Sequence, residues 1–203
     1  MSETKGARTR ARLVESMLEL IQARGYSGTG LNTVVGHSGA PKGSMYFHLP
    51  EGKEALGEQA VELAAERFRT LVGEAALEGG SPGDAVRRII DILAGMLTDS
   101  DFQLGCPVSV VTLEMATESD RLRTACATAF DSWITPVATY LAAVGHDEPA
   151  ARTLATTLVS AVEGAVIVSR AQRSTEPLRC AAEVLAHLVD ATPAAPGSEA
   201  GTR

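Results

Sequence analysis

Residues 25–56, GYSGTGLNTVVGHSGAPKGSMYFHLPEGKEAL, contain two short helical patterns joined by a tight turn and followed by the start of a third. Thr29 is a suitable N-cap for the first helix, because its hydroxyl can accept a hydrogen bond from a free backbone N–H. Gly39 suits the positive φ at a helix C-terminus, and Pro41 lacks a backbone donor, so the first helix should end here. This layout is typical of a helix-turn-helix, whose second helix lies in the major groove of DNA.

The second helix of this segment, over residues 42–49, combines small, cationic and hydrogen-bonding side chains with apolar ones. The polar side chains can donate hydrogen bonds to base edges and phosphates, whereas Met45, Phe47 and Leu49 can pack inward. We therefore expect direct contacts with DNA from Lys42, Gly43, Ser44, Tyr46 and His48.

The segment resembles the N-terminal domain of the TetR (tetracycline-repressor) family of bacterial transcriptional regulators. The matching residues agree in order and spacing: Gly25-Tyr26, Thr29, Gly39, Lys42-Gly43-Ser44, Tyr46, Pro50 and Lys53-Glu54-Ala55-Leu56. The resemblance implies that residues 42–44 approach bases and that Tyr46, His48 and Lys53 bind phosphates. The expected DNA-binding set is Thr29, Asn32, Thr33, Lys42, Gly43, Ser44, Tyr46, His48 and Lys53.

Three features of the segment depart from the usual pattern of that family. Gly52 is an extra residue before Lys53, and Ala40-Pro41 replaces the more usual Val-Ser. The second departure is similar to the branch that contains lincomycin-resistance and flavonoid-responsive repressors. Gly36 lies inside the first helix of the motif and costs about 1 kcal/mol of helix propensity against alanine, so this helix should depend on packing.

Charge is distributed unevenly along the 203 residues. The formal net charge is −7, but residues 1–53 hold seven Lys or Arg against four Asp or Glu, which leaves a local balance of +3 and −10 for the rest. A basic segment attached to an acidic body favours contact with phosphates through one end only. The uneven charge is therefore compatible with DNA binding despite the acidic total.

Cysteine and histidine spacing indicates neither a zinc site nor a disulfide framework. Cys106, Cys126 and Cys180 are far apart, and we expect buried, inert thiols with a redox sensor as the alternative. No apolar stretch is expected to reach the roughly 18–20 residues of a membrane helix, and the polar N-terminus lacks a signal sequence. These features predict a cytoplasmic protein without a cofactor, a metal or a membrane partner.

Apolar residues recur at helical spacing through the remaining chain, without a strand pattern or a repeat. We predict an all-α fold of about nine helices, with a DNA-binding domain over 1–54, an effector-binding and dimerisation domain over 55–191, and a disordered tail over 192–203. After a flexible arm over 1–8, the first helix should begin at Thr9. Later helices should begin near Pro50, Ser81, Cys106, Ser119, Asp147 and Pro177, and Pro136 should kink one of them.

The helix expected over 147–173 is apolar on nearly every side, so it must be covered all round. A copy of itself in a second subunit could cover it, whereas a central helix in a monomer is the alternative. In the family that the chain resembles, the last two helices form a four-helix dimer interface, which favours the homodimer. The expected interface residues are Thr156, Val159, Ser160, Gly164, Ile167, Val184 and Leu188.

The resemblance also implies an apolar effector pocket in the body of the protein. Methionine and aromatic side chains suit adaptable binding of flat hydrophobic molecules, although each of them could instead be ordinary core. Glu114 and Glu163 could orient a polar or cationic group of the ligand, or be solvated surface carboxylates. The expected pocket residues are Phe68, Leu71, Met96, Phe102, Cys106, Val110, Leu113, Glu114, Phe130, Trp133, Val137 and Glu163.

An enzyme and a DNA-independent adaptor are the alternative functions. Residues 39–44, GAPKGS, hold the residue types of a phosphate loop in the wrong order and follow no predicted strand, and no nucleophile motif is recognisable. The sequence therefore favours a homodimeric, ligand-responsive repressor that releases a palindromic operator in double-stranded DNA when a small hydrophobic effector binds.

Overall fold

The computed structural model describes residues 5–41 and 51–191, and the regular structure in these two ranges is entirely helical. The helices are α1 (Lys5–Arg24), α2 (Leu31–Ser38), α4 (Gly52–Leu77), α5 (Pro82–Asp99), α6 (Pro107–Met115), α7 (Asp120–Ala143), α8 (Glu148–Gln172) and α9 (Glu176–Asp190). This composition confirms the all-α prediction. The expected recognition helix over 42–49 and the tail over 192–203 lie outside the described residues.

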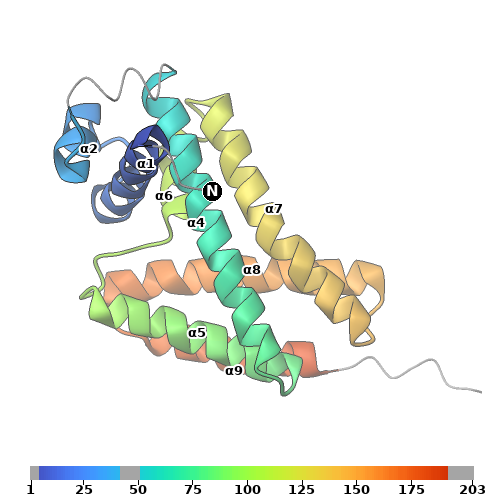
Figure 1. Ribbon diagram of the computed structural model, residues 1–203. Helices are drawn as coiled ribbons and strands as arrows, with labels where there is room; N and C mark the ends of the chain where they lie inside the picture. Colours follow the sequence, from blue (N-terminus) through green and yellow to red (C-terminus); the bar gives the residue numbers. More distant parts are fainter. Residues whose placement is uncertain (1–4, 42–50, 192–203) are drawn as a thin grey trace, which may run out of the picture.

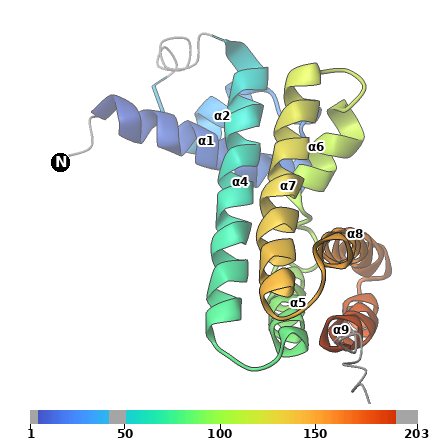
Figure 2. The ribbon, with the colours of Figure 1, turned by 90° about the vertical axis from the view of Figure 1, so that its right-hand side faces the viewer.

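The two long helices α4 and α7 run side by side and connect the two ends of the molecule (Figure 2). The N-terminal helices α1 and α2 lie at one end, where α1 crosses α4 (Figure 1). At the other end, α8 packs against α7 and α9, and α9 packs against α5. Side chains at the middle of α4 and α7 therefore lie between the N-terminal helices and the C-terminal helices.

Helix starts in the body follow the local sequence as predicted. Ser81 and Asp84 form a capping box at the start of α5, with a proline at the first helical position. The side chain of Ser119 accepts a hydrogen bond from the Leu122 backbone at the start of α7, and Asp147 accepts one from Ala150 at the start of α8. Each cap satisfies a backbone N–H that has no partner inside its helix.

Two predictions about the N-terminal helices were wrong. Helix α1 begins at Lys5, so residues 5–8 belong to the helix and not to a flexible arm. The N-cap of α2 is Gly30 and not Thr29. Thr29 is fully buried, and its hydroxyl donates a hydrogen bond of 2.7 Å to the backbone oxygen of Gly25. The hydroxyl therefore closes the link between α1 and α2, while Gly39, with a φ of +61°, ends α2 as predicted.

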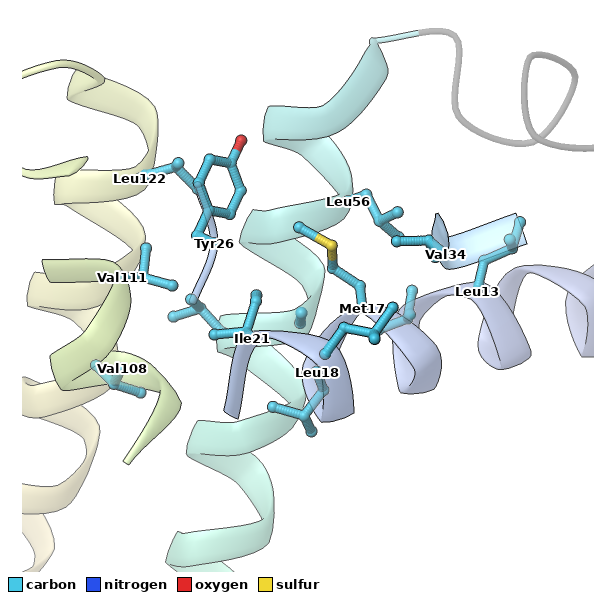
Figure 3. Packing of buried hydrophobic residues seen from close by; sticks show 14 of the residues in the cluster. Leu13, Met17, Leu18, Ile21, Tyr26, Val34, Leu56, Val108, Val111 and Leu122 are labelled. Atoms are coloured by element: carbon cyan, nitrogen blue, oxygen red, sulfur yellow. The ribbon is translucent and has the colours of Figure 1, made fainter. Parts of the chain in front are cut away.

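The buried apolar residues form two clusters, which we call the upper core and the lower core. The upper core joins α1, α2, α4, α6 and the first part of α7, and Figure 3 shows Met17 of α1 and Val34 of α2 meeting Leu56 of α4. The lower core joins α5, α8, α9 and the second part of α7. Because the upper core continues across residues 54 and 55, the N-terminal helices are packed directly onto the body, and the domain division stays a prediction.

Helix α8 has the length and composition of a membrane-spanning helix, and only 22% of its apolar window is buried. The expectation that no stretch reaches this length and hydropathy was therefore wrong. The same helix packs against α7 on one side and α9 on another, which leaves a third side of small and apolar residues open. Helix α7 is continuous through Pro136, and the predicted kink stays a prediction.

Candidate functional site

The described residues of the predicted DNA-binding set lie just before α2, on α2 and at the start of α4. Asn32 and Thr33 are exposed on α2 and free to approach a ligand. Thr29 is fully buried, so its side chain is not available to DNA and its inclusion among the predicted contacts was wrong. Residues 42–48, which supply most of the predicted contacts, lie outside the described residues.

Arg12 connects α1 to the end of α2, a role that the sequence analysis missed. Its guanidinium donates a hydrogen bond to the backbone oxygen of Ser38, the last residue of α2. A Cβ atom at Gly39 would lie 2.9 Å from the same guanidinium, so the arginine would have to shift if a larger residue stood at this positive-φ position. The contact holds the turn of the helix-turn-helix against α1.

Lys53 lies over the ring of Tyr26, with its Nζ atom 4.2 Å from the ring centroid. Burial lowers the pKa of the Lys53 ammonium, and the nearby Glu114 carboxylate partly opposes that change. Burial, and then the Glu54 carboxylate, raise the pKa of Tyr26 to about 12. The ammonium therefore rests on a neutral aromatic ring between α4 and the link after α1. Phosphate binding by Lys53 stays a prediction.

Glu114, at the end of α6, joins the body to the link between α1 and α2. Its carboxylate accepts a hydrogen bond of 2.7 Å from the Ser27 backbone N–H. The contact is tight, because a Cβ atom at Gly25 would lie 2.1 Å from Oε1 of Glu114 and Gly25 has a φ of +79°. The end of α6 is therefore in direct contact with the residues that precede α2.

One cavity, which we call the apolar cavity, has a volume of about 300 Å3. It lies between α4, α5, α7 and α8, and its lining is almost entirely hydrocarbon. The lining includes Phe68, Val72, Val86, Ile89, Ile90, Trp133, Pro136, Val137, Leu141, Leu158, Val159 and Val162. A cavity of this size and composition suits a flat apolar molecule, which it could bind without fixing its orientation.

A second cavity, which we call the polar cavity, has a volume of about 270 Å3 and reaches from α8 to α1. Leu18 and Gln22 of α1 form part of its wall, and Glu163 of α8 forms another part. The Glu163 side chain accepts hydrogen bonds from the Ser109 hydroxyl and the Cys106 thiol. Burial raises the pKa of Glu163, and these two hydrogen bonds partly oppose the increase.

Trp133 and Phe68 line both cavities and form the wall between them. Their ring centroids are 4.7 Å apart, and Phe130 meets the indole edge-on at 5.4 Å. The indole N–H donates a hydrogen bond of 3.1 Å to the backbone oxygen of Ala65. The indole is thus held in one orientation at the border of both cavities, and a role for Trp133 in effector binding stays a prediction.

The structure separates the predicted pocket residues into two groups. Phe68, Leu71, Met96, Cys106, Trp133, Val137 and Glu163 line one or both cavities. The residues outside the two linings are Phe102, Val110, Leu113, Glu114 and Phe130.

The excluded residues have other partners. Val108 and Val111 are buried on the inner face of α6, and Leu113 lies on the opposite face, where it is 78% exposed. Val110 and Phe130 pack against the upper core, whereas Phe102 packs against the lower core. Glu114 binds Ser27 instead of a cavity. The apolar wall from α5 and α8 was the main part that the sequence analysis missed, because several helices there carry similar aliphatic stripes.

The three cysteines differ in burial. Burial raises the pKa of the Cys106 and Cys126 thiols, which keeps both neutral and unreactive. Cys180 is exposed on α9, so the expectation that all three are buried was wrong. No group of three metal-ligating side chains occurs in the described ranges 5–41 and 51–191.

Most of the predicted dimer residues lie on one open face of α8 and α9. Ile167 is 48% exposed, Val184 is 62% exposed and Leu188 is 44% exposed. Thr156, Ser160 and Gly164 are also exposed. Val159 is the exception, since its side chain lines the apolar cavity.

Comparison with known proteins identifies the family. Residues 82–184 match the family model of the C-terminal domain of LmrA/YxaF-like transcriptional regulators. The chain is 34% identical over 181 residues to the HTH-type transcriptional regulator YxaF of Bacillus subtilis, covering 89% of this chain and 95% of that protein. It is 32% identical over 176 residues to the HTH-type transcriptional repressor DhaR of a Mycobacterium species, covering 83% and 86% respectively.

Solved structures agree with this assignment. A TetR transcriptional regulator from Chloroflexus aurantiacus superimposes with a TM-score of 0.76 at 26% identity, covering 93% of this chain and 97% of that one. A regulatory protein TetR from Rhodobacter sphaeroides has the same fold, with a TM-score of 0.79 at 23% identity and coverage of 89% and 98%. The chain therefore belongs to the TetR family of HTH-type transcriptional regulators, in its LmrA/YxaF-like group.

Proposed function

We propose that the protein is a homodimeric repressor that binds a palindromic operator through residues 1–54 and releases it when a small hydrophobic molecule enters the body. The observation that carries this proposal is the position of the polar cavity. Its wall combines Leu18 and Gln22 of α1 with residues of α4, α5, α7 and α8. A molecule in this cavity would touch α1 and the body at once.

Helix α6 offers a second connection between the cavities and the N-terminal helices. Near its start, Ser109 is bound to Glu163 in the polar cavity, and near its end Glu114 is bound to Ser27. A ligand that binds one arrangement of these contacts more tightly shifts the population toward it. Release follows if the favoured arrangement changes the distance between the two recognition helices of the dimer.

A second copy of the chain is the proposed cover for the open face of α8 and α9. Small residues at Thr156, Ser160 and Gly164 allow two helices to approach closely, and Ile167 and Val184 supply apolar area. A two-fold dimer places its recognition helices about one turn of DNA apart, roughly 34–36 Å, which predicts a palindromic site.

Selection of binding sites from random DNA tests the DNA-binding part of the proposal. Recovered sites should be palindromic, with half-sites about one helical turn apart. Lys42→Ala and Tyr46→Ala should each weaken binding to the selected site by roughly 1–3 kcal/mol, and replacement of Lys53 should reduce the salt slope by about one. Unchanged affinity for all three variants in a folded dimer would contradict it.

Gly164→Arg tests the proposed dimer face, and the same substitution at Gly95 on α5 is the matched control. A Cβ atom at Gly164 meets nothing within 4 Å in the single chain, and the same is true at Gly95 on α5. Both substitutions replace a helical glycine, so neither should harm folding of the single chain. Light scattering should report a monomer only for Gly164→Arg, because the arginine would be buried without a partner in the dimer. A monomeric native chain would refute the proposal.

We place this protein in the cytoplasm, where its proposed operator is accessible. Its relatives are transcriptional regulators and not enzymes. We therefore do not assign a reaction to either cavity.

A further inference from the structure

Glu163 is the unusual group in the polar cavity. It comes from α8, a helix that is otherwise small and aliphatic around this position, and its carboxyl group is largely withdrawn from solvent. Ser109 and Cys106 donate hydrogen bonds to it from the start of α6. A buried carboxylate is costly unless a cation or further donors compensate its charge.

The remaining charged and titratable groups of this cavity do not compensate Glu163. Arg67 of α4 also lines the cavity, but it donates two hydrogen bonds, of 2.8 and 2.5 Å, to Glu15 of α1. The Cys106 thiol is neutral because burial raises its pKa. The lining residues from α1, α5 and α7 are uncharged. Within the described ranges, no ion pair joins Glu163 to a basic side chain.

We propose that the effector is an amphipathic amine, with an apolar body and a protonated nitrogen that binds Glu163 in the polar cavity. This inference rests on the proposed function, in which the two cavities are the effector site. The apolar body would lie against Phe68 and Trp133, which both cavities share, and would extend into the apolar cavity.

The charge of the site favours an amine over a neutral or acidic head group. A protonated nitrogen both donates hydrogen bonds and neutralises the buried carboxylate, whereas a hydroxyl group only donates. An acidic head group would be repelled by Glu163 and would have to separate Arg67 from Glu15. The aromatic faces of Trp133 and Phe68 add a further attraction for a cation.

A matched series of three compounds tests the head group on the full-length protein: 4-phenylbutylamine, 4-phenylbutan-1-ol and 4-phenylbutyrate. They share a phenyl ring and a four-carbon framework and differ mainly in charge. Isothermal titration calorimetry should show the amine binding at least about tenfold more tightly than the alcohol and the acid. Equal affinities, tighter binding of the acid, or no binding of the amine would overturn the inference.

Two variants test whether Glu163 causes the tighter binding of the amine. Glu163→Gln should bring the amine to the affinity of the alcohol, while the affinity of the alcohol changes by less than about threefold. The control Glu114→Gln makes the same change outside the cavity and should keep the amine preference. A preference that survives Glu163→Gln would overturn the inference.

The native protein supplies a test that needs no variant. Below the pKa of Glu163 the carboxyl group is protonated, so the amine should bind more tightly as pH rises through that pKa, whereas binding of the alcohol should change little. A flat profile for the amine would contradict a contact with Glu163.

The inference and the proposed function fail in different ways. If the three compounds bind equally but another hydrophobic compound releases operator DNA, only the amine assignment is wrong. If compounds that bind beside Trp133 never release the operator, the proposed function is wrong as well.

Discussion

The two cavities share one aromatic wall but differ in what they can do. The apolar cavity is lined by helices of the body alone, and its lining is nearly all hydrocarbon. The polar cavity includes Gln22 of α1 and the buried carboxyl group of Glu163. Apolar surface provides affinity without orientation, whereas placed polar groups fix orientation. We therefore expect the apolar cavity to control how tightly a molecule binds and the polar cavity to control which molecule causes release.

Trp133→Ala should have the largest effect, because it removes the wall that separates the cavities. The indole is buried, packs between Phe68 and Phe130, and donates a hydrogen bond to Ala65. Truncation should lower the free energy of unfolding by about 3–5 kcal/mol. Urea unfolding followed by circular dichroism, at one protein concentration, measures this loss.

The same variant tests whether effector response and DNA binding depend on different parts of the protein. If Trp133→Ala still forms a folded dimer, affinity for the selected DNA site should stay near the native value and the response to effector should weaken. Trp133→Phe is the control that keeps an aromatic wall. A loss below about 1 kcal/mol would show that the two cavities do not depend on this side chain.

Val137→Phe should fill part of the apolar cavity without touching the polar one. Val137 lines only the apolar cavity, and a larger side chain there leaves less room for the phenyl ring of 4-phenylbutan-1-ol. We expect about tenfold weaker binding, equivalent to about 1.4 kcal/mol. Calorimetry measures the change, and Leu113→Phe on the exposed face of α6 is the control. If Val137→Phe and Leu113→Phe weakened binding of 4-phenylbutan-1-ol equally, the apolar cavity would not be the site that holds the phenyl ring.

The pH dependence of stability should show the smallest effect and reports on the polar cavity alone. Burial raises the folded-state pKa of Glu163 above its unfolded value. Its protonated form therefore stabilises the fold at low pH, and this contribution is lost as pH rises through the folded-state pKa. Relative to the native protein, Glu163→Gln should gain stability as pH rises through that window, measured by unfolding at several pH values.

Ser109→Ala sharpens the same experiment. The hydrogen bond from Ser109 lowers the pKa of Glu163. Removal of the Ser109 hydroxyl should therefore shift the pH range over which Glu163 affects stability to higher pH. Identical windows in Ser109→Ala and the native protein would show that the hydroxyl does not influence the carboxyl group.

Local sequence determined where most helices begin and end. The caps at Ser81, Ser119 and Asp147 and the left-handed Gly39 were predictable, because each acts on backbone groups within a few residues. The exceptions were the start of α1 and the role of Thr29, which is fully buried and whose hydroxyl donates a hydrogen bond to the Gly25 backbone oxygen. The residue type of Thr29 suggested a cap, but its hydroxyl is bonded to Gly25, and Gly30 takes the N-cap position of α2.

The sequence by itself therefore determined the all-α fold, the helix-turn-helix segment and the apolar character of the body. Only the tertiary structure distinguished Glu163 from Glu114, since both follow apolar residues and are indistinguishable by pattern. One lies in the polar cavity and the other binds Ser27 at the surface. Helical periodicity shows which residues share a face, but the neighbour that meets that face depends on how distant helices pack, and this decides what a carboxylate can bind.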